Sequence, residues 1–122
     1  MATAAAVALA QDLARLLDSK KAEEVVILDV SARHSLIDCF VIATARSPRH
    51  AAVLGEEALA LVKGRELQPW HVEGASDWVC ADFGDVVVHV FTDQARGFYA
   101  LEHLWADAVR VAFAPIEQQA SA

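Results

Sequence analysis

Residues 78–92 read WVCADFGDVVVHVFT, and this stretch gives the clearest strand signal in the chain. Two runs rich in β-branched and aromatic residues, at 78–82 and 86–92, flank a short segment that contains a glycine. Strand-forming runs separated in this way are typical of a β-hairpin. The stretch therefore predicts two antiparallel strands joined by a turn at Phe83, Gly84 and Asp85.

Two further strands are expected upstream of the hairpin. Residues 25–30 (VVILDV) and 38–44 (DCFVIAT) are apolar runs short enough to be buried strands. Alternation in the second run predicts two faces, one with Cys39, Val41 and Ala43 and the other with Phe40, Ile42 and Thr44. Residues 67–72 are a weaker candidate because Pro69 fits only an edge strand or a strand start, and residues 73–77 are expected to turn.

Three helical segments complete the pattern. Residues 5–19 have apolar side chains at three- and four-residue spacing, and residues 93–113 show a similar stripe with Arg96 near its solvent edge. Between them, Ser47 and Pro48 predict a helix start, and Gly64 is expected to end that helix in the left-handed conformation.

The order of these elements predicts the fold class. Helix, two strands, helix, three strands and helix indicate one α/β domain with a mixed sheet of about five strands and helices packed on it. This domain is expected to span residues 1–114, followed by a disordered tail at 115–122. A chain of 122 residues is the usual length for one domain.

Charge and composition exclude several classes of function. The formal net charge is −7, which disfavours direct nucleic-acid binding and suits a basic protein partner. Cys39 and Cys80 lack metal-ligand spacing and are expected to be buried thiols in a reducing compartment. The absence of a recognisable signal peptide and of a long apolar run predicts a cytoplasmic protein without a membrane span.

No catalytic or metal site is predicted from the residues. Two-metal chemistry needs paired carboxylates on one strand face, whereas Asp82 and Asp85 flank a turn, where aspartate usually accepts backbone hydrogen bonds. The histidines are scattered, and the serines lack a nucleophile motif. His89 interrupts an apolar strand and is interpreted as a core histidine with one hydrogen bond, in preference to a catalytic base. Trp78 is left open between a core residue and an anchor for a basic partner.

Several segments, taken in order, resemble the ribosome silencing factor family, also called Iojap-like. The resemblance spans about residues 20–107, and its segments are 25–30, 38–44, Ser47–His50, Glu73-Gly74, 78–91, Arg96, Phe98-Tyr99, Leu101-Glu102 and Leu104-Trp105. It implies a fold similar to nucleotidyltransferases without their catalytic residues. Trp70 and His71 depart from the family pattern and receive no role.

The resemblance also implies a function. Members of this family bind the fourteenth protein of the large ribosomal subunit, block association with the small subunit, and lower translation when nutrients are scarce. The chain is therefore expected to be a non-enzymatic translation repressor that acts by occupancy and needs no cofactor or metal.

The expected contacts with the ribosome lie on the hairpin. The residues that match the family there are Trp78, Asp82, Phe83, Gly84 and Asp85, with Tyr99 as an addition. Trp78 and Phe83 would supply apolar anchoring, and Gly84 the turn itself. One alternative is a divergent nucleotidyltransferase-like or hydrolytic enzyme, and another is a homodimer in which the Trp78 surface serves self-association.

Overall fold

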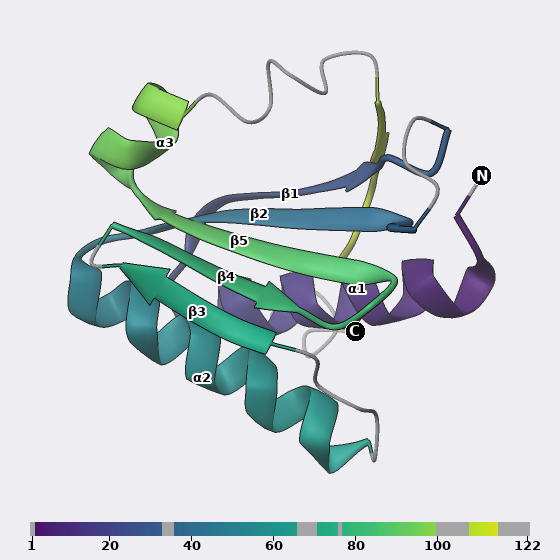
Figure 1. Ribbon diagram of the computed structural model, residues 1–122, viewed down its shortest axis with the longest axis horizontal. Helices are drawn as coiled ribbons and strands as arrows, with labels where there is room; N and C mark the ends of the chain where they lie inside the picture. Colours follow the sequence, from purple (N-terminus) through teal and green to yellow (C-terminus); the bar gives the residue numbers. More distant parts are fainter. Residues whose placement is uncertain (1, 33–35, 66–70, 76, 100–107, 115–122) are drawn as a thin grey trace.

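The apolar run in the first half of the chain forms β2 (Cys39–Ala45), which is buried at every position. In the computed structural model, which describes residues 2–32, 36–65, 71–75, 77–99 and 108–114, β2 lies inside a mixed sheet (Figure 1). The sheet order is β3-β4-β5-β2-β1-β6, with β2 and β5 parallel and the other neighbours antiparallel. The predicted α/β class with a mixed sheet is confirmed.

The remaining elements follow the expected order with two differences, which concern the bounds of β3 and the additional strand β6. The strands are β1 (Glu23–Asp29), β3 (His71–Ala75), β4 (Trp78–Asp82), β5 (Val86–Thr92) and β6 (Val109–Val111), and the helices are α1 (Ala4–Ser19), α2 (Pro48–Gly64) and α3 (Asp93–Tyr99). α1 and α2 cover one face of the sheet, and α3 lies on the other side (Figure 1).

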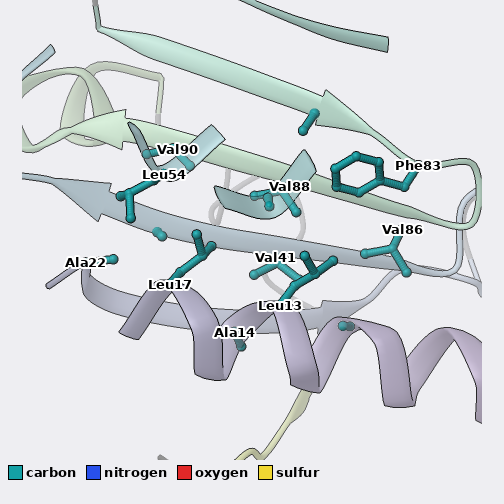
Figure 2. Packing of buried hydrophobic residues seen from close by; sticks show 14 of the residues in the cluster. Leu13, Ala14, Leu17, Ala22, Val41, Leu54, Phe83, Val86, Val88 and Val90 are labelled. Atoms are coloured by element: carbon teal, nitrogen blue, oxygen red, sulfur yellow. The ribbon is translucent and has the colours of Figure 1, made fainter. Parts of the chain in front are cut away.

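Each face of the sheet has its own apolar layer. On the side of α1 and α2, Leu13, Leu17 and Leu54 pack against alternate strand residues (Figure 2). The second layer contains Phe40 and Ile42. The predicted alternation of β2 is confirmed, since Cys39, Val41 and Ala43 belong to the helix-covered layer. A strand between two such layers must be apolar at every position, which explains the uninterrupted run.

The predicted start of α2 is confirmed, and its end differs from the prediction. The Ser47 hydroxyl accepts a hydrogen bond from the His50 backbone N–H at 3.1 Å, and Pro48 occupies the first helical turn. Gly64 is the last helical residue, and the cap is Arg65 with φ −96°. Gly64 is not among the residues with positive φ, so its expected left-handed conformation is wrong.

Two strand assignments also correct the sequence prediction. Residues 71–75 form β3, where a turn was expected from residue 73, because they pair with β4 along its whole length. Residues 109–111 form β6 on the outer edge of β1, so the last helix does not continue to residue 113. Such short segments have weak preferences of their own, and pairing decides their conformation. Residues 66–70, 100–107 with Trp105, and the expected tail at 115–122 lie outside the described residues.

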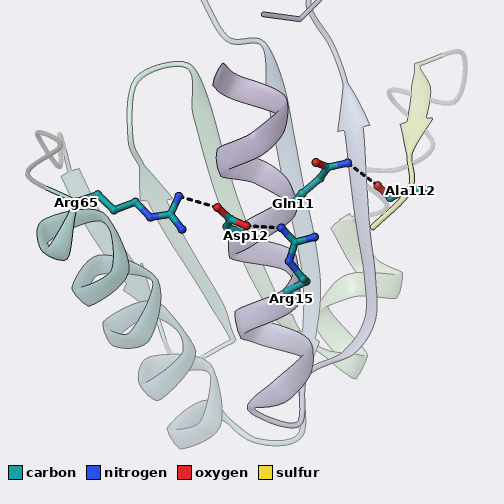
Figure 3. Close-up of polar contacts among 5 residues, drawn as sticks. All are labelled: Gln11, Asp12, Arg15, Arg65 and Ala112. Atoms are coloured by element: carbon teal, nitrogen blue, oxygen red, sulfur yellow. Dashed lines mark hydrogen bonds and ion pairs between the residues drawn. The ribbon is translucent and has the colours of Figure 1, made fainter. Parts of the chain in front are cut away.

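Polar contacts join α1 to neighbouring segments of the fold. Asp12 forms ion pairs with Arg15 and with Arg65, the latter at 2.7 Å, and the Gln11 amide donates to the Ala112 carbonyl at 2.9 Å (Figure 3). Burial raises the pKa of Asp12, but hydrogen bonds and charge from the two arginines outweigh it, so this pKa lies below its ordinary value. The carboxylate thereby joins α1 to the end of α2.

Replacing Gly55 by alanine tests how closely α2 approaches β4. A Cβ at this buried position would lie 2.8 Å from Val79 Cγ1. Overpacking costs about 1–3 kcal/mol, and alanine gains about 1 kcal/mol over glycine in a helix. Because valine has little rotamer freedom to move away, we expect Gly55→Ala to lower the free energy of unfolding by about 1 kcal/mol, measured by urea denaturation with circular dichroism.

Gly64→Ala is the matched control for this substitution. Gly64 is in the same helix, and a Cβ added there would meet no heavy atom within 4 Å. Alanine should therefore be neutral or stabilise by up to about 1 kcal/mol at this position. A Gly55→Ala protein as stable as its Gly64→Ala counterpart would contradict the tight contact.

Candidate functional site

The predicted hairpin is confirmed in its strands and in its turn. β4 and β5 pair from Trp78 opposite Phe91 to Asp82 opposite Val87. The Asp82 carboxylate accepts a hydrogen bond from the Gly84 backbone N–H at 2.9 Å, and Gly84 has φ 88°. This left-handed conformation is strained for residues with a Cβ, so the turn requires a glycine here.

The alternation along β4 decides which expected contact residues share a surface. Trp78 and Asp82 are half-buried, whereas Val79 and Ala81 between them are buried on the side of the helices. Trp78 and Asp82 therefore lie on the sheet face opposite α1 and α2. They are at the two ends of β4, about 13 Å apart at roughly 3.3 Å per residue, so a single partner must extend along the strand to contact both.

Phe83 lies in the core and not on the surface. Its side chain is 8% exposed and packs in the helix-covered layer beside Val86 and Val88 (Figure 2). A buried ring cannot anchor a partner while the turn keeps this conformation. The sequence-based assignment of Phe83 as an apolar anchor is therefore revised: the ring fixes the turn to the core.

Two expected contact residues remain, Asp85 and Tyr99, and the structure describes the side chain of Asp85 only. Asp85 is exposed, and its backbone carbonyl accepts hydrogen bonds from the N–H groups of Asp38 and Cys39 at 2.8 and 3.1 Å. Tyr99 is the last residue of α3, and its side chain lies outside the described part of the structure. The described surface of the candidate site thus consists of Trp78, Asp82 and Asp85, which we call the hairpin surface.

Trp78 is joined to His89 across the hairpin. The indole Nε1–H donates a hydrogen bond to His89 Nδ1 at 3.2 Å, and the indole lies 5.1 Å from the Phe91 ring. The His89 ring contacts Phe40 edge-on at 4.9 Å and is 8% exposed. The predicted core histidine with one hydrogen bond is confirmed, and Trp78 contributes both to this aromatic cluster and to the surface.

Two ionisable groups of the sheet, His89 and Cys39, are neutral at pH 7. Burial lowers the pKa of His89 to about 4, although the charge of Asp82 acts in the opposite direction. Burial, with additional effects of Asp29 and Asp38, raises the pKa of Cys39 to about 12. Neither group offers the charged form that acid or thiolate chemistry would use at neutral pH.

Metal-ligating side chains are dispersed in the described part of the structure. Within the described ranges, no three side chains of histidine, cysteine, aspartate or glutamate converge so that they could hold a metal ion. Over the same parts of the chain, no helix combines the length and hydropathy needed to cross a bilayer. The arrangement at the hairpin is a half-buried aromatic residue and two carboxylates on a rigid support, which suits protein recognition.

His50 is a structural clamp that the sequence did not reveal. Its Nδ1 accepts a hydrogen bond from the Arg46 backbone N–H at 2.9 Å, and its Nε2–H donates to the Lys20 carbonyl at 2.8 Å. The imidazole thus joins the turn before β1 to the turn before α2. No local signal indicates this role, since Lys20 lies 30 residues away in sequence.

Arg96 is likewise a buried clamp, although its helix stripe predicted a position near solvent. It is 8% exposed, and its guanidinium donates to the Glu24 carbonyl and to the Thr44 hydroxyl, the latter at 2.8 Å. Glu24 has φ 48° at an irregularity in β1, which exposes its carbonyl to the guanidinium. Arg96 thereby fixes α3 on the sheet.

The lowered pKa of His89 predicts a loss of stability in acid. The unfolded chain takes up a proton near the ordinary pKa of 6.5, whereas the folded chain does so only near 4. The contribution of His89 to the free energy of unfolding is therefore fully present above pH 6.5. It falls as the pH drops toward 4, by about 2 kcal/mol at pH 5. We expect the free energy of unfolding, measured in urea, to fall between pH 7 and pH 5 by about 2 kcal/mol less in His89→Phe than in the unsubstituted protein. Identical losses in the two proteins would refute this role of His89.

Comparisons with known proteins show which family the chain belongs to and agree with its fold. A family model described as ribosomal silencing factor during starvation matches residues 3–122. Ribosomal silencing factor RsfS of Halalkalibacterium halodurans is 36% identical over 97 residues, covering 78% of this chain and 83% of the relative. Mitochondrial assembly of ribosomal large subunit protein 1 of Mus musculus is 32% identical over 98 residues, covering 76% of this chain and 43% of that protein. A crystal structure of a protein from Chromobacterium violaceum superposes with a TM-score of 0.77 at 30% identity and covers 93% of both chains. The chain therefore belongs to the ribosomal silencing factor family.

Proposed function

We propose that this protein binds the large ribosomal subunit through its fourteenth protein, blocks association with the small subunit, and represses translation under nutrient limitation. Membership of the ribosomal silencing factor family is the observation that carries this proposal, because the family model matches nearly the whole chain. The family role is regulatory, and we propose that the protein acts in the cytoplasm by occupancy without catalysis or a cofactor.

Charge supports a basic protein as the partner. The chain has a net charge of −7, and the hairpin surface presents the exposed Asp85 and the half-buried Asp82. Acidic groups of this kind steer a basic partner toward one face and disfavour approach to bare phosphate groups. The electrostatic contribution should therefore come from carboxylates at the turn.

Shape supports the same surface. Phe83 packs in the core below the turn and Gly84 allows its backbone path, so both act through the shape of the docking surface. Trp78 adds a half-buried indole held by His89 and Phe91. A large aromatic side chain with fixed orientation loses little entropy on binding, which favours it as an anchor. We place Tyr99, on α3, at the margin of this surface.

Charge changes at the turn test the electrostatic part of this proposal. In sedimentation with separated subunits, the unsubstituted protein should travel with the large subunit and not with the small one. Asp85→Arg replaces attraction by repulsion and should weaken capture at least tenfold, about 1.4 kcal/mol, with the larger defect at low salt. Asp82→Asn keeps an acceptor for the Gly84 N–H and removes only the charge, so it should weaken capture while the hairpin stays folded.

Glu56→Arg is the control for these charge changes. Glu56 is exposed on α2, which covers the opposite face of the sheet, and its reversal changes the net charge as much as Asp85→Arg does. We expect it to leave capture unchanged. Equal loss in Glu56→Arg and Asp85→Arg would show that net charge, and not the hairpin surface, controls binding. Metal-dependent nucleotide turnover abolished in Asp82→Asn would instead support the enzyme alternative.

Truncating Trp78 tests the apolar part. Trp78→Ala should weaken capture about thirtyfold, or about 2 kcal/mol, measured at a temperature where circular dichroism shows the variant to be folded. It should also lower the melting temperature, because it removes the hydrogen bond to His89 and the ring contact with Phe91. Trp78→Phe retains an aromatic ring and should recover part of both effects. A destabilised Trp78→Ala protein that still binds normally would assign this indole to the core alone.

A further inference from the structure

The burial of Phe83 leaves the hairpin turn without an apolar side chain on its surface. Among the described residues, the large hydrophobic side chains that are exposed are Leu36 at 77%, Val109 at 68% and Val53 at 41%. Single exposed apolar residues are common on proteins, so exposure alone carries no function. Leu36, however, is two residues before Asp38, whose backbone N–H contacts the turn at the Asp85 carbonyl.

Leu36 lies next to the segment that contacts the turn directly. The backbone N–H groups of Asp38 and Cys39 donate to the Asp85 carbonyl at 2.8 and 3.1 Å, and Cys39 pairs with Val86. The start of β2 and the β4–β5 turn therefore lie at the same end of the sheet (Figure 1). Two residues span at most about 7 Å, so the Leu36 backbone is within that distance of Asp38.

The backbone that follows Leu36 is held from several sides. The Asp38 carboxylate accepts a hydrogen bond from the Thr3 N–H at 3.0 Å, and the Asp38 carbonyl accepts one from the Val30 N–H at 2.9 Å. Ile37 packs against the apolar layer that contains Phe40. The N-terminus of α1, the end of β1 and the hairpin turn thus fix the backbone two residues after Leu36, which lowers the backbone entropy lost when this segment enters a complex.

We propose that Leu36 is the apolar anchor at the turn end of the hairpin surface, and that it enters an apolar pocket bordered by cationic groups on a basic protein. This inference rests on the proposed function and names the contact that Phe83 was expected to provide. Charge selects the partner, because the neighbouring Asp85 is exposed and the chain has a net charge of −7. The docking surface therefore extends from the turn to the start of β2.

Leu36→Ser tests this assignment by sedimentation with separated large subunits. Burying a leucine side chain contributes enough that its loss should weaken capture about tenfold. Because Leu36 is 77% exposed, the melting temperature should remain close to that of the unsubstituted protein. The conservative variant Leu36→Met keeps an apolar side chain of similar volume and should bind the large subunit as the unsubstituted protein does. Leu36→Ala is a second truncation for the case that serine lowers the melting temperature. It should also weaken capture of the large subunit, by less than serine does.

Val53→Ser is the matched control, since Val53 is exposed on α2 on the opposite face and serine and valine have similar helix preferences. It should bind normally. Normal capture by Leu36→Ser together with loss in Asp85→Arg would overturn the Leu36 anchor and leave the proposed function standing. If Leu36→Ser changes the oligomeric mass of the isolated protein but not its capture by the large subunit, Leu36 contacts a second copy of the chain, and the proposal is overturned. Failure of the unsubstituted protein to bind the large subunit would overturn both.

Discussion

The parallel pairing of β2 with β5 is the constraint on which the rest of the structure depends. Both strands are buried along nearly their whole length, so apolar layers are needed on both faces of the sheet. A parallel pair also needs a crossover, and α2 supplies it while covering one face. The register, with Cys39 opposite Val86, brings the start of β2 to the end of the sheet where the hairpin turns. The candidate docking surface follows from this register.

Hydrogen bonds of polar side chains fix the elements around this pair. Arg96 joins α3 to Thr44 at the end of β2, and His50 joins the two turns at the same end of the sheet. In the interior, His89 accepts the indole N–H of Trp78 and remains neutral because burial lowers its pKa to about 4. Arg96 and His89 are buried, and their hydrogen bonds offset part of the cost of burying these polar side chains. Arg96 and His50 hold the segments around β1 and β2, and His89 holds the Trp78 side chain of the hairpin.

The described residues at the turn end of the sheet combine buried groups with exposed ones. Cys39 has its pKa raised to about 12, and the Asp82 carboxylate is engaged with the turn backbone. Exposed groups at the turn end include Asp85 and Leu36, an anionic and an apolar side chain. This combination matches the proposed occupancy mechanism, in which a basic partner is captured and the bulk of the domain excludes a competing subunit.

The sequence by itself determined the family, the hairpin at 78–92, the alternation of β2 and the start of α2 at Ser47, because each depends on neighbours a few residues apart. Only the tertiary structure decided that β3 continues to residue 75, that β6 is a strand, that Phe83 is buried, and that Arg96 is a clamp whose partners lie 52 and 72 residues away. The hairpin itself was predictable from the sequence, and the exposure of each side chain on it was not. Exposure depends on which distant elements cover a residue, and local periodicity contains no information about them.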